Sequence, residues 1–232
     1  CIRDRLETEQ RKLYLAAVVD AREKLRAAKP EDKMTVFAVL MRLREICCDP
    51  RLVADNWTGS SAKLDACLEL VTEAVAGGHR ILLFSQFTSM LELLAKRLDE
   101  AGVSHFTLQG STPKPVRAEQ VRRFNQGEAD VFLISLRAGG TGLNLTAADI
   151  VIHYDPWWNL AAQNQATDRA YRIGQRNPVQ VYRLIAQDTI EEKIVELQQA
   201  KQSLADTVTG GADGAILSMN PEQLLQLLGE EA

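Results

Sequence analysis

The sequence predicts an α/β fold in which a mostly parallel sheet is flanked by helical segments at both ends of the chain. Short apolar runs alternate with stretches of helical periodicity, which is typical of a parallel sheet with helices on both faces. The runs are continuously apolar rather than alternating, as expected for strands that are buried on both sides. The predicted strands span residues 81–84, 106–108, 131–134, 150–154 and 179–185.

The N-terminal part of the chain predicts two helices and a linker. The first helix reaches residue 28 and is ended by Lys29-Pro30. The second covers residues 34–47 and is ended by Asp49-Pro50, and residues 55–61 predict a linker because they contain Gly59 and two serines. The apolar face of the first helix is formed by Ile2, Leu6, Leu13 and Ala17.

Further helices are predicted between the strands and after the last one. The helix over residues 63–76 ends at Gly77-Gly78, a pair that is typical of a helix C-terminus. Thr189 is placed to cap an amphipathic helix. The remaining predicted helices cover residues 91–101, 116–125, 160–171, 190–204 and 221–228, with Gly210-Gly211 interrupting the last two.

Composition is typical of a globular protein rather than a disordered, fibrous or disulfide-rich one. Apolar residues make up 46% and charged residues 25% of the 232, close to the average for globular domains. No apolar run approaches the roughly 18 residues of a membrane span, and no secretory leader opens the sequence. We therefore expect a cytoplasmic protein without a membrane partner. Because the first residue is Cys1 rather than Met, we also expect a fragment or a processed chain.

Charge and cysteine usage exclude few function classes. Residues 1–185 contain 25 basic and 22 acidic residues, a balance of +3, whereas residues 186–232 contain 2 basic and 9 acidic residues, a balance of −7. The net charge of −4 neither requires nor excludes a nucleic-acid partner. The four cysteines form no C-x-x-C pair and the three histidines are scattered, so we predict no metal site and interpret the cysteines as thiols in a reducing compartment.

Small, hydroxyl-bearing, amide and glycine residues follow the predicted strands. In open parallel sheets, ligands bind beyond the carboxyl ends of the strands, and exposed amides and hydroxyls there suit phosphate oxygens. The glycines at positions 139, 140 and 142 lack the spacing of a P-loop or a dinucleotide fingerprint, and a tight turn would explain them equally well. The segments concerned, which we call the carboxyl-edge loops, are residues 85–87, 109–112, 135–142 and 155–159.

Residues 165–175 carry the strongest signal for chemistry. On a helix, Gln165, Arg169 and Arg172 share one face. Two guanidinium groups near the sheet edge can bind one anionic ligand and stabilise the charge that develops during phosphoryl transfer. The alternative is a salt-bridged surface helix with Asp168 as a partner, which for these residues alone is the more common outcome.

Two adjacent tryptophans, Trp157 and Trp158, follow the fourth predicted strand. Exposing two such side chains together is unfavourable. We expect one to anchor in the core and the other to stack on a base or enter a nucleic-acid groove.

A close resemblance to the Swi/Snf-related DNA-translocating ATPases of helicase superfamily two is carried by residues 135–175, SLRAGGTGLNLTAADIVIHYDPWWNLAAQNQATDRAYRIGQ. This run resembles helicase motifs five and six. Residues 81–87 are similar to motif four, and residues 108–112 to the block after it. The resemblance continues through segments that lead into the second lobe and through the start of a C-terminal bracing helix, at residues 42–50, 61–64 and 189–193.

This resemblance implies that the chain is a RecA-like three-layer domain, the second lobe of a two-lobed motor. In the family, ATP with Mg²⁺ binds between the lobes, and the first lobe supplies the P-loop and the metal-binding acidic residues. The second lobe supplies arginine fingers, which by position would be Arg169 and Arg172, with Gln165 beside them at the nucleotide. The implied segments are residues 1–61, which lead from the first lobe, the RecA-like lobe at 62–188, and bracing helices at 189–232.

The resemblance also implies three partners: double-stranded DNA, the first lobe of the same polypeptide, and a DNA-bound protein substrate. The chain departs from the family pattern at Leu160, where proline is usual, and at Gln163, where an acidic residue is common. Arg137 replaces a frequent lysine and keeps its charge. The family contacts to nucleic acid fall on Gln86, Gly110, Ser111, Thr112, Arg137, Gly139, Thr141 and Trp158.

The implied function is that of a DNA-dependent ATPase that moves along duplex DNA and remodels protein–DNA complexes. The lobe alone is expected to be inactive, since half of the phosphate-binding site is on the other lobe. A regulatory module that binds nucleic acid or protein without catalysis is the alternative, and a P-loop with an Asp-Glu pair upstream in the gene would favour the ATPase. A small-molecule enzyme is disfavoured because the sequence shows no dinucleotide fingerprint or acid/base pair.

Overall fold

The chain forms two compact units, which are described separately. The computed structural model describes residues 1–139, 143–168, 170, 178–205 and 219–229. The sheet unit comprises Cys1–Ile2 and Leu64–Leu184, and the helical unit comprises Arg3–Lys63 and Ile185–Ala232. The division into segments at residues 61/62 and 188/189 stays a prediction, and the first and last of those segments lie largely in the helical unit.

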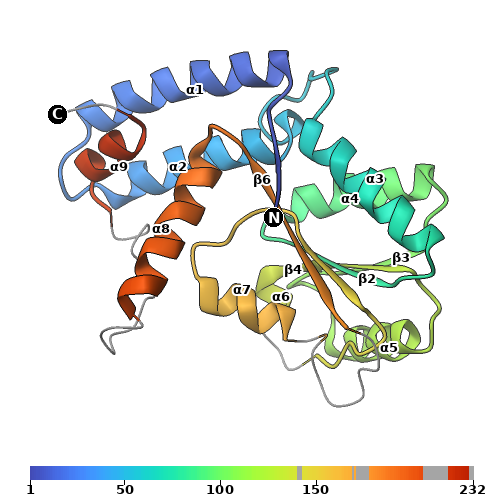
Figure 1. Cartoon of the computed structure of the whole chain (residues 1–232). Coiled ribbons are helices and arrows are strands. Elements are labelled where there is room, and N and C mark those ends of the chain that lie inside the picture. The colour runs from blue at the N-terminus through green and yellow to red at the C-terminus, as the bar shows by residue number, and fades with distance from the viewer. Residues whose placement is uncertain (140–142, 169, 171–177, 206–218, 230–232) are drawn as a thin grey trace. The chain divides into compact units, whose positions relative to one another are not determined.

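A twisted parallel sheet is the centre of the fold (Figure 1). Its strands are β1 (Ile2–Asp4), β2 (Ile81–Ser85), β3 (His105–Leu108), β4 (Val131–Ser135), β5 (Ile150–His153) and β6 (Gln180–Ala186). The order across the sheet is β1-β6-β5-β2-β4-β3, and β2 pairs in parallel with both β4 and β5, as do β3 with β4 and β5 with β6. Every residue of β2, β4 and β5 is buried, which explains their continuously apolar sequence.

Helices cover both faces of this sheet. They are α3 (Ala62–Ala76), α4 (Thr88–Glu100), α5 (Lys114–Asn125), α6 (Leu136–Gly139) and α7 (Leu160–Thr167). Figure 1 shows α3 and α4 on one face and α5, α6 and α7 on the other. Because side chains alternate along a strand, Leu82 and Phe84 of β2 share a face with Phe132 of β4, where they pack with Phe124 of α5 and Ala166 of α7. The predicted three-layer α/β fold is confirmed.

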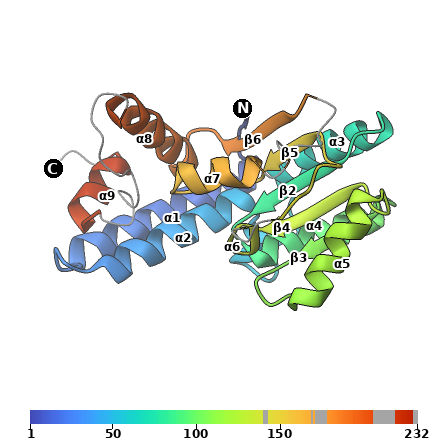
Figure 2. The same ribbon diagram turned by 90° about the horizontal axis from the view of Figure 1, so that it is seen from below.

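A helical hairpin organises the helical unit. The helices are α1 (Thr8–Ala27), α2 (Lys33–Cys48), the short 3-10 helix η1 (Pro50–Leu52), α8 (Ile190–Ala205) and α9 (Pro221–Leu227). Figure 2 shows α1 and α2 lying along each other with α9 against them. Asp32 caps α2 by accepting the backbone N–H of Thr35 at 3.0 Å. Arg22 of α1 donates to the carbonyl of Leu228 at 2.5 Å, which ties the end of α9 to the hairpin.

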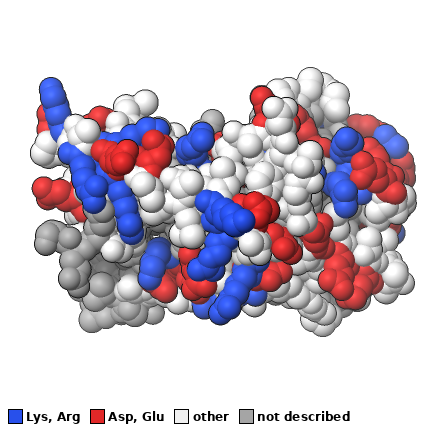
Figure 3. All heavy atoms as spheres, turned by 90° about the horizontal axis from the view of Figure 1, so that it is seen from above, with Lys and Arg blue, Asp and Glu red and all other residues white. Residues whose placement is uncertain are grey.

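Charged side chains of both signs are interspersed on the outer face of α1 (Figure 3). Lys12 lies 2.6 Å from Glu9, and Lys24 lies 2.7 Å from Asp20. Residues three and four positions apart are neighbours on a helix, so these pairs follow from the helix itself. Each is exposed and contributes about 1 kcal/mol or less.

One local prediction was wrong. Ile2 was expected in the first helix but lies in β1, and α1 begins only at Thr8. Strand pairing overrides the helical pattern there, since the backbone carbonyl of Asp4 accepts the backbone N–H of Gln187 at 2.8 Å. The segment after β4 continues as the short helix α6, in which the Ser135 hydroxyl accepts the N–H of Ala138 at 3.3 Å, and the tight turn considered for the glycines lies largely outside the described residues.

The cysteines behave as expected from the sequence. All four are free thiols; three of them are buried and Cys1 is exposed. Within the part of the chain that the structure describes, the helices are too short or too polar to cross a bilayer.

Candidate functional site

The carboxyl-edge loops begin at nearly the same level of the sheet. The register pairs Ser85 with Ser135, Phe84 with His153, and Leu108 with Ile134. Neighbouring strands are about 4.8 Å apart, so the loops after β5, β2, β4 and β3 follow one another along about 14 Å of a single edge. This is the edge at which parallel sheets bind their ligands.

Asp155, which begins the carboxyl-edge loop over residues 155–159, fixes the loop after β2, a role that the sequence analysis did not assign to it. The Ser85 hydroxyl donates to its carboxylate at 2.6 Å, and the backbone N–H of Gln86 donates at 3.3 Å. Asp155 is fully buried, and a buried carboxylate is tolerated only when donors surround it. The loops after β2 and β5 are therefore joined through one side chain. Its place directly after a buried strand, level with Ser85, is the signal that could have identified it.

Gln86 combines a fixed backbone with an unsatisfied side chain. The residue is half-buried, and its Nε2 is shielded from solvent and makes no hydrogen bond to any described residue. A shielded donor without an acceptor is unfavourable. A phosphate oxygen or a base edge at this position would satisfy it.

The loop after β3 offers open backbone. The N–H of Gln109 donates to the Thr112 hydroxyl at 3.0 Å, and the N–H of Thr112 donates to the Gln109 carbonyl at 3.1 Å. This turn leaves Gly110 and Ser111 exposed and Thr112 half-buried. A Cβ built on Gly110 would meet no atom within 4 Å, so a ligand can approach the backbone there.

The loop after β4 is described only in part. Arg137 and Gly139 belong to α6, whereas the Arg137 side chain and Thr141 lie outside the described residues. The structure therefore describes the backbone positions of Arg137 and Gly139, which follow β4 at the same edge of the sheet as Gln86.

Both tryptophans of the loop after β5 lie within the described residues. Trp157 is half-buried and packs against the core that contains Phe84 and Phe132. Its backbone N–H donates to Gln163 Oε1 of α7 at 3.2 Å. Trp158 is also half-buried but is not among the residues packed on that core. The anchoring role therefore belongs to Trp157.

Helix α7 ends earlier than predicted. It stops at Thr167, and Asp168 and Ala170 lie in a turn in which the N–H of Ala170 donates to the carbonyl of Thr167 at 3.1 Å. The Thr167 hydroxyl bonds back to the Gln163 carbonyl at 3.2 Å, and such local side-chain bonds compete with helix continuation. Gln165 is exposed on α7. Arg169 and Arg172 lie outside the described residues, so their predicted common face with Gln165 is not described either.

Among the residues that the structure describes, no group of three or more His, Cys, Asp or Glu side chains is placed to hold a metal ion. The nucleotide contacts predicted for this chain are Gln165, Arg169 and Arg172. Of these, exposed Gln165 is the one within the described ranges, and its amide is free to meet a ligand at the surface of α7. Residues that would bind Mg²⁺ were predicted on the first lobe.

His153 predicts a measurable acid sensitivity of the fold. Burial and the positive charge of Arg183 lower the pKa of His153 to about 3, whereas an unfolded histidine titrates near 6.5. Between these values the unfolded chain binds more protons, so the free energy of unfolding falls as the pH falls, by up to about 1.4 kcal/mol per pH unit. We expect His153→Phe to flatten this dependence between pH 6.5 and 4 in urea unfolding experiments. His79→Gln is the control, since the His79 side chain is 41% exposed and pairs with Asp149, and equal slopes for the two variants would contradict the prediction.

Residues 62–174 match the family described as Helicase conserved C-terminal domain. Over 226 residues the chain is 36% identical to an uncharacterised ATP-dependent helicase of Mycoplasma genitalium, an alignment that covers 96% of this chain and 22% of that protein. Over 216 residues it is 37% identical to the SWI/SNF-related matrix-associated actin-dependent regulator of chromatin subfamily A member 1 of Mus musculus, covering 88% of this chain and 21% of that protein. The chain thus spans about a fifth of the length of these relatives.

Solved structures of a Sulfolobus solfataricus protein match the fold over its full length. The SWI2/SNF2 ATPase C-terminal domain of that organism superposes with a TM-score of 0.80 at 27% identity, covering 100% of this chain and 97% of that chain. The SWI2/SNF2 ATPase core in complex with double-stranded DNA superposes with a TM-score of 0.80 at 29% identity, covering 100% of this chain and 49% of that chain. The chain belongs to the Swi/Snf-related family of helicase superfamily two, in which it corresponds to the C-terminal lobe.

Proposed function

We propose that this chain is the second motor lobe of a DNA-dependent ATPase that moves along double-stranded DNA and remodels protein–DNA complexes. The observation that carries the proposal is the single sheet edge at which the loop after β3 exposes Gly110 and Ser111 and the loop after β2 holds the unsatisfied amide of Gln86. A relative whose name includes ATP-dependent helicase and a structural neighbour bound to double-stranded DNA support it.

In this proposal the duplex lies along the carboxyl edge. The backbone amides of Gly110 and Ser111 and the hydroxyls of Ser111 and Thr112 donate to phosphate oxygens, and such contacts fix position without reading sequence. The Gln86 amide gains the acceptor that it lacks within the described chain. The remaining contacts to one strand of the DNA are made by Arg137, Gly139, Thr141 and Trp158.

ATP binds between this lobe and the first lobe of the same polypeptide. Mg²⁺, held by the first lobe, would neutralise charge on the phosphates when bound. From this chain, Arg169 and Arg172 stabilise the charge that develops on the departing γ-phosphoryl group, and Gln165 contacts the nucleotide beside them. Closure of the lobes on ATP brings the guanidinium groups to the phosphate, and reopening after hydrolysis advances this lobe along the strand.

The proposal is tested by ATP turnover of the full-length protein with and without duplex DNA, at a stated salt concentration because phosphate contacts are salt-dependent. We expect duplex DNA to stimulate hydrolysis and the 232-residue chain alone to show no turnover. A full-length protein that binds duplex DNA but hydrolyses no ATP would contradict the motor and support the regulatory module instead.

Trp158 is expected to link hydrolysis to movement. Trp158→Ala removes a ring that stacks against the nucleic acid, a contact worth about 1–3 kcal/mol, while the core anchor Trp157 remains. We expect about tenfold less translocation per ATP hydrolysed, measured by displacement of a third strand from duplex DNA, with an unchanged melting temperature. Trp158→Phe, which keeps an aromatic face, is the control. Normal translocation by the alanine variant would rule out a DNA contact at this residue.

A further inference from the structure

A chain of hydrogen bonds in the sheet unit, which includes the buried side chains of His153 and Gln163, joins the end of β5 to the end of α7. His153, the last residue of β5, is 1% exposed, and its Nε2 lies 2.9 Å from the hydroxyl of Thr167, the last residue of α7. The imidazole ring stacks on Phe84 of β2, with ring centroids 5.6 Å apart and planes inclined by 21°. Both the position and the orientation of the ring are therefore fixed.

The direction of these hydrogen bonds follows from the atoms available. Thr167 has one hydroxyl hydrogen, and the Gln163 carbonyl, 3.2 Å away, can only accept it. The Thr167 oxygen is then the acceptor for His153, whose Nε2 carries the proton. The depressed pKa of His153 keeps the ring neutral at physiological pH, so this tautomer persists.

Gln163 continues the chain of bonds to the tryptophan loop. It is 1% exposed, and its Oε1 accepts the backbone N–H of Trp157 at 3.2 Å. The same loop is held on its other side by Asp155, which accepts from Ser85 and Gln86. A displacement of this loop therefore acts on Gln163, and through it on Thr167.

Thr167 is also the residue at which the arginine segment begins, a name that we give to residues 167–172 because they include Arg169 and Arg172. Arg169 follows Thr167 by two positions in the sequence and lies outside the described residues. The structure describes Thr167, which is held by His153, and Ala170, which is completely buried and whose N–H donates to the Thr167 carbonyl at 3.1 Å. The chain of hydrogen bonds therefore ends two sequence positions before the first predicted arginine finger.

We propose that His153, Thr167 and Gln163 are positioning residues, which we call the polar relay, and that they couple contacts of the 155–158 loop with DNA to placement of the arginine segment at ATP. The inference rests on the proposed function. None of the three contacts a reactant. Their hydrogen bonds transmit a shift of the loop because packed, hydrogen-bonded groups move together.

The test measures ATPase activity of full-length variants over a range of duplex DNA concentrations. Thr167→Val keeps the side-chain shape but removes the hydroxyl, and Thr167→Ser keeps the hydroxyl. We expect the stimulation of kcat by DNA to fall about tenfold in the valine variant, with less than about a twofold change in basal kcat and in the KM for ATP. The serine variant is expected to retain the stimulation. Combining Thr167→Val with His153→Phe, which keeps the ring stacked on Phe84, is expected to cause no further loss, since both remove the same bond.

A second pair of variants keeps the proposal testable if Thr167→Val melts at a lower temperature than the wild type. Gln163→Leu removes the acceptor for the Trp157 N–H, and Gln163→Glu keeps it, so only the leucine variant is expected to lose stimulation by DNA. If the wild type is not stimulated by DNA, the proposed function and the relay both fail. If the wild type is stimulated and the matched variants respond equally, or basal and stimulated rates fall together, the relay alone fails.

Discussion

Replacing Arg172 by alanine in the full-length protein is expected to lower the DNA-stimulated kcat by about a thousandfold or more. An arginine finger neutralises charge that appears on the phosphoryl oxygens only in the transition state, and losses of this size are typical when such a group is removed. Because the contact strengthens in the transition state, kcat is expected to fall more than affinity for ATP. Steady-state ATPase assays at saturating duplex DNA measure the change.

Arg122→Ala is the matched control for this experiment. Arg122 lies on α5, is about half exposed, and pairs with Glu119 at 2.5 Å. Its removal changes the net charge by the same amount, but an exposed ion pair contributes little. We expect turnover within about twofold of the wild type. Turnover of Arg172→Ala as high as that of the control would show that Arg172 is not a finger.

The strands were predicted well because local sequence determines them. The strand predicted over residues 81–84 is observed as Ile81–Ser85, and the strand predicted over residues 131–134 is observed as Val131–Ser135. A continuous apolar segment is stable as a strand only when both faces of the sheet are covered, which is why the pattern was informative. The parallel topology then placed the loops at one edge without further information. The elements that were not predicted, β1 and α6, depend on partners distant in the chain or on a single hydroxyl cap.

The hydrogen bonds that hold the loops of the candidate site in place could not be predicted from local sequence. Asp155, His153 and Gln163 lie within the run that resembles helicase motifs five and six, but the sequence does not show which side chains they bond to, because those partners are brought together by the fold. Asp155 meets Ser85 from 70 positions away, and His153 meets Thr167 from 14 positions away. The residues that offer open surface, such as Gly110, follow from their place after a strand; those that hold the loops in place do not.

The helical unit contains a buried ion pair that is expected to dominate its stability. The Lys63 ammonium bonds to the Glu191 carboxylate, and these side chains are 4% and 0% exposed. Glu191 also accepts the backbone N–H of Ala186 at 2.9 Å. Burial acts to lower the pKa of Lys63, but Glu191 together with the neighbouring Cys48 and Cys47 outweighs burial, and the pKa of Lys63 is raised. The stabilisation is therefore complete at neutral pH and is lost only as the pH rises through the elevated pKa of Lys63.

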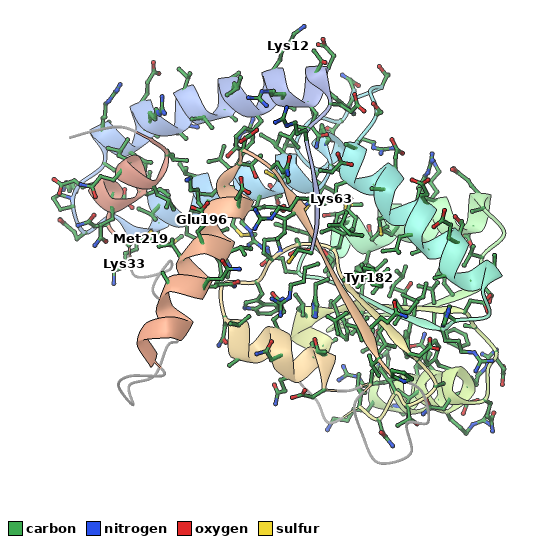
Figure 4. The ribbon with its side chains drawn as sticks, viewed as in Figure 1. Lys12, Lys33, Lys63, Tyr182, Glu196 and Met219 are labelled. Carbon is green, nitrogen blue, oxygen red and sulfur yellow. The ribbon has the colours of Figure 1, made fainter. Side chains whose placement is uncertain are left out.

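Lys63→Met is expected to lower the free energy of unfolding by about 3–5 kcal/mol, because it leaves the Glu191 carboxylate buried without a cation. Lys12→Met is the control: Figure 4 shows Lys12 at the outer surface of α1, and its pair with Glu9 is exposed. This control is expected to cost less than about 1 kcal/mol. Urea unfolding of the 232-residue chain measures both.

A neutral replacement of both partners separates the cost of an unpaired charge from the cost of lost packing. In Lys63→Met combined with Glu191→Gln, the glutamine still accepts the Ala186 N–H but no charge is buried, so part of the stability is expected to return. A Lys63→Met deficit that is unrelieved by Glu191→Gln would mean that the lysine stabilises the unit by filling space, and that the charges contribute nothing.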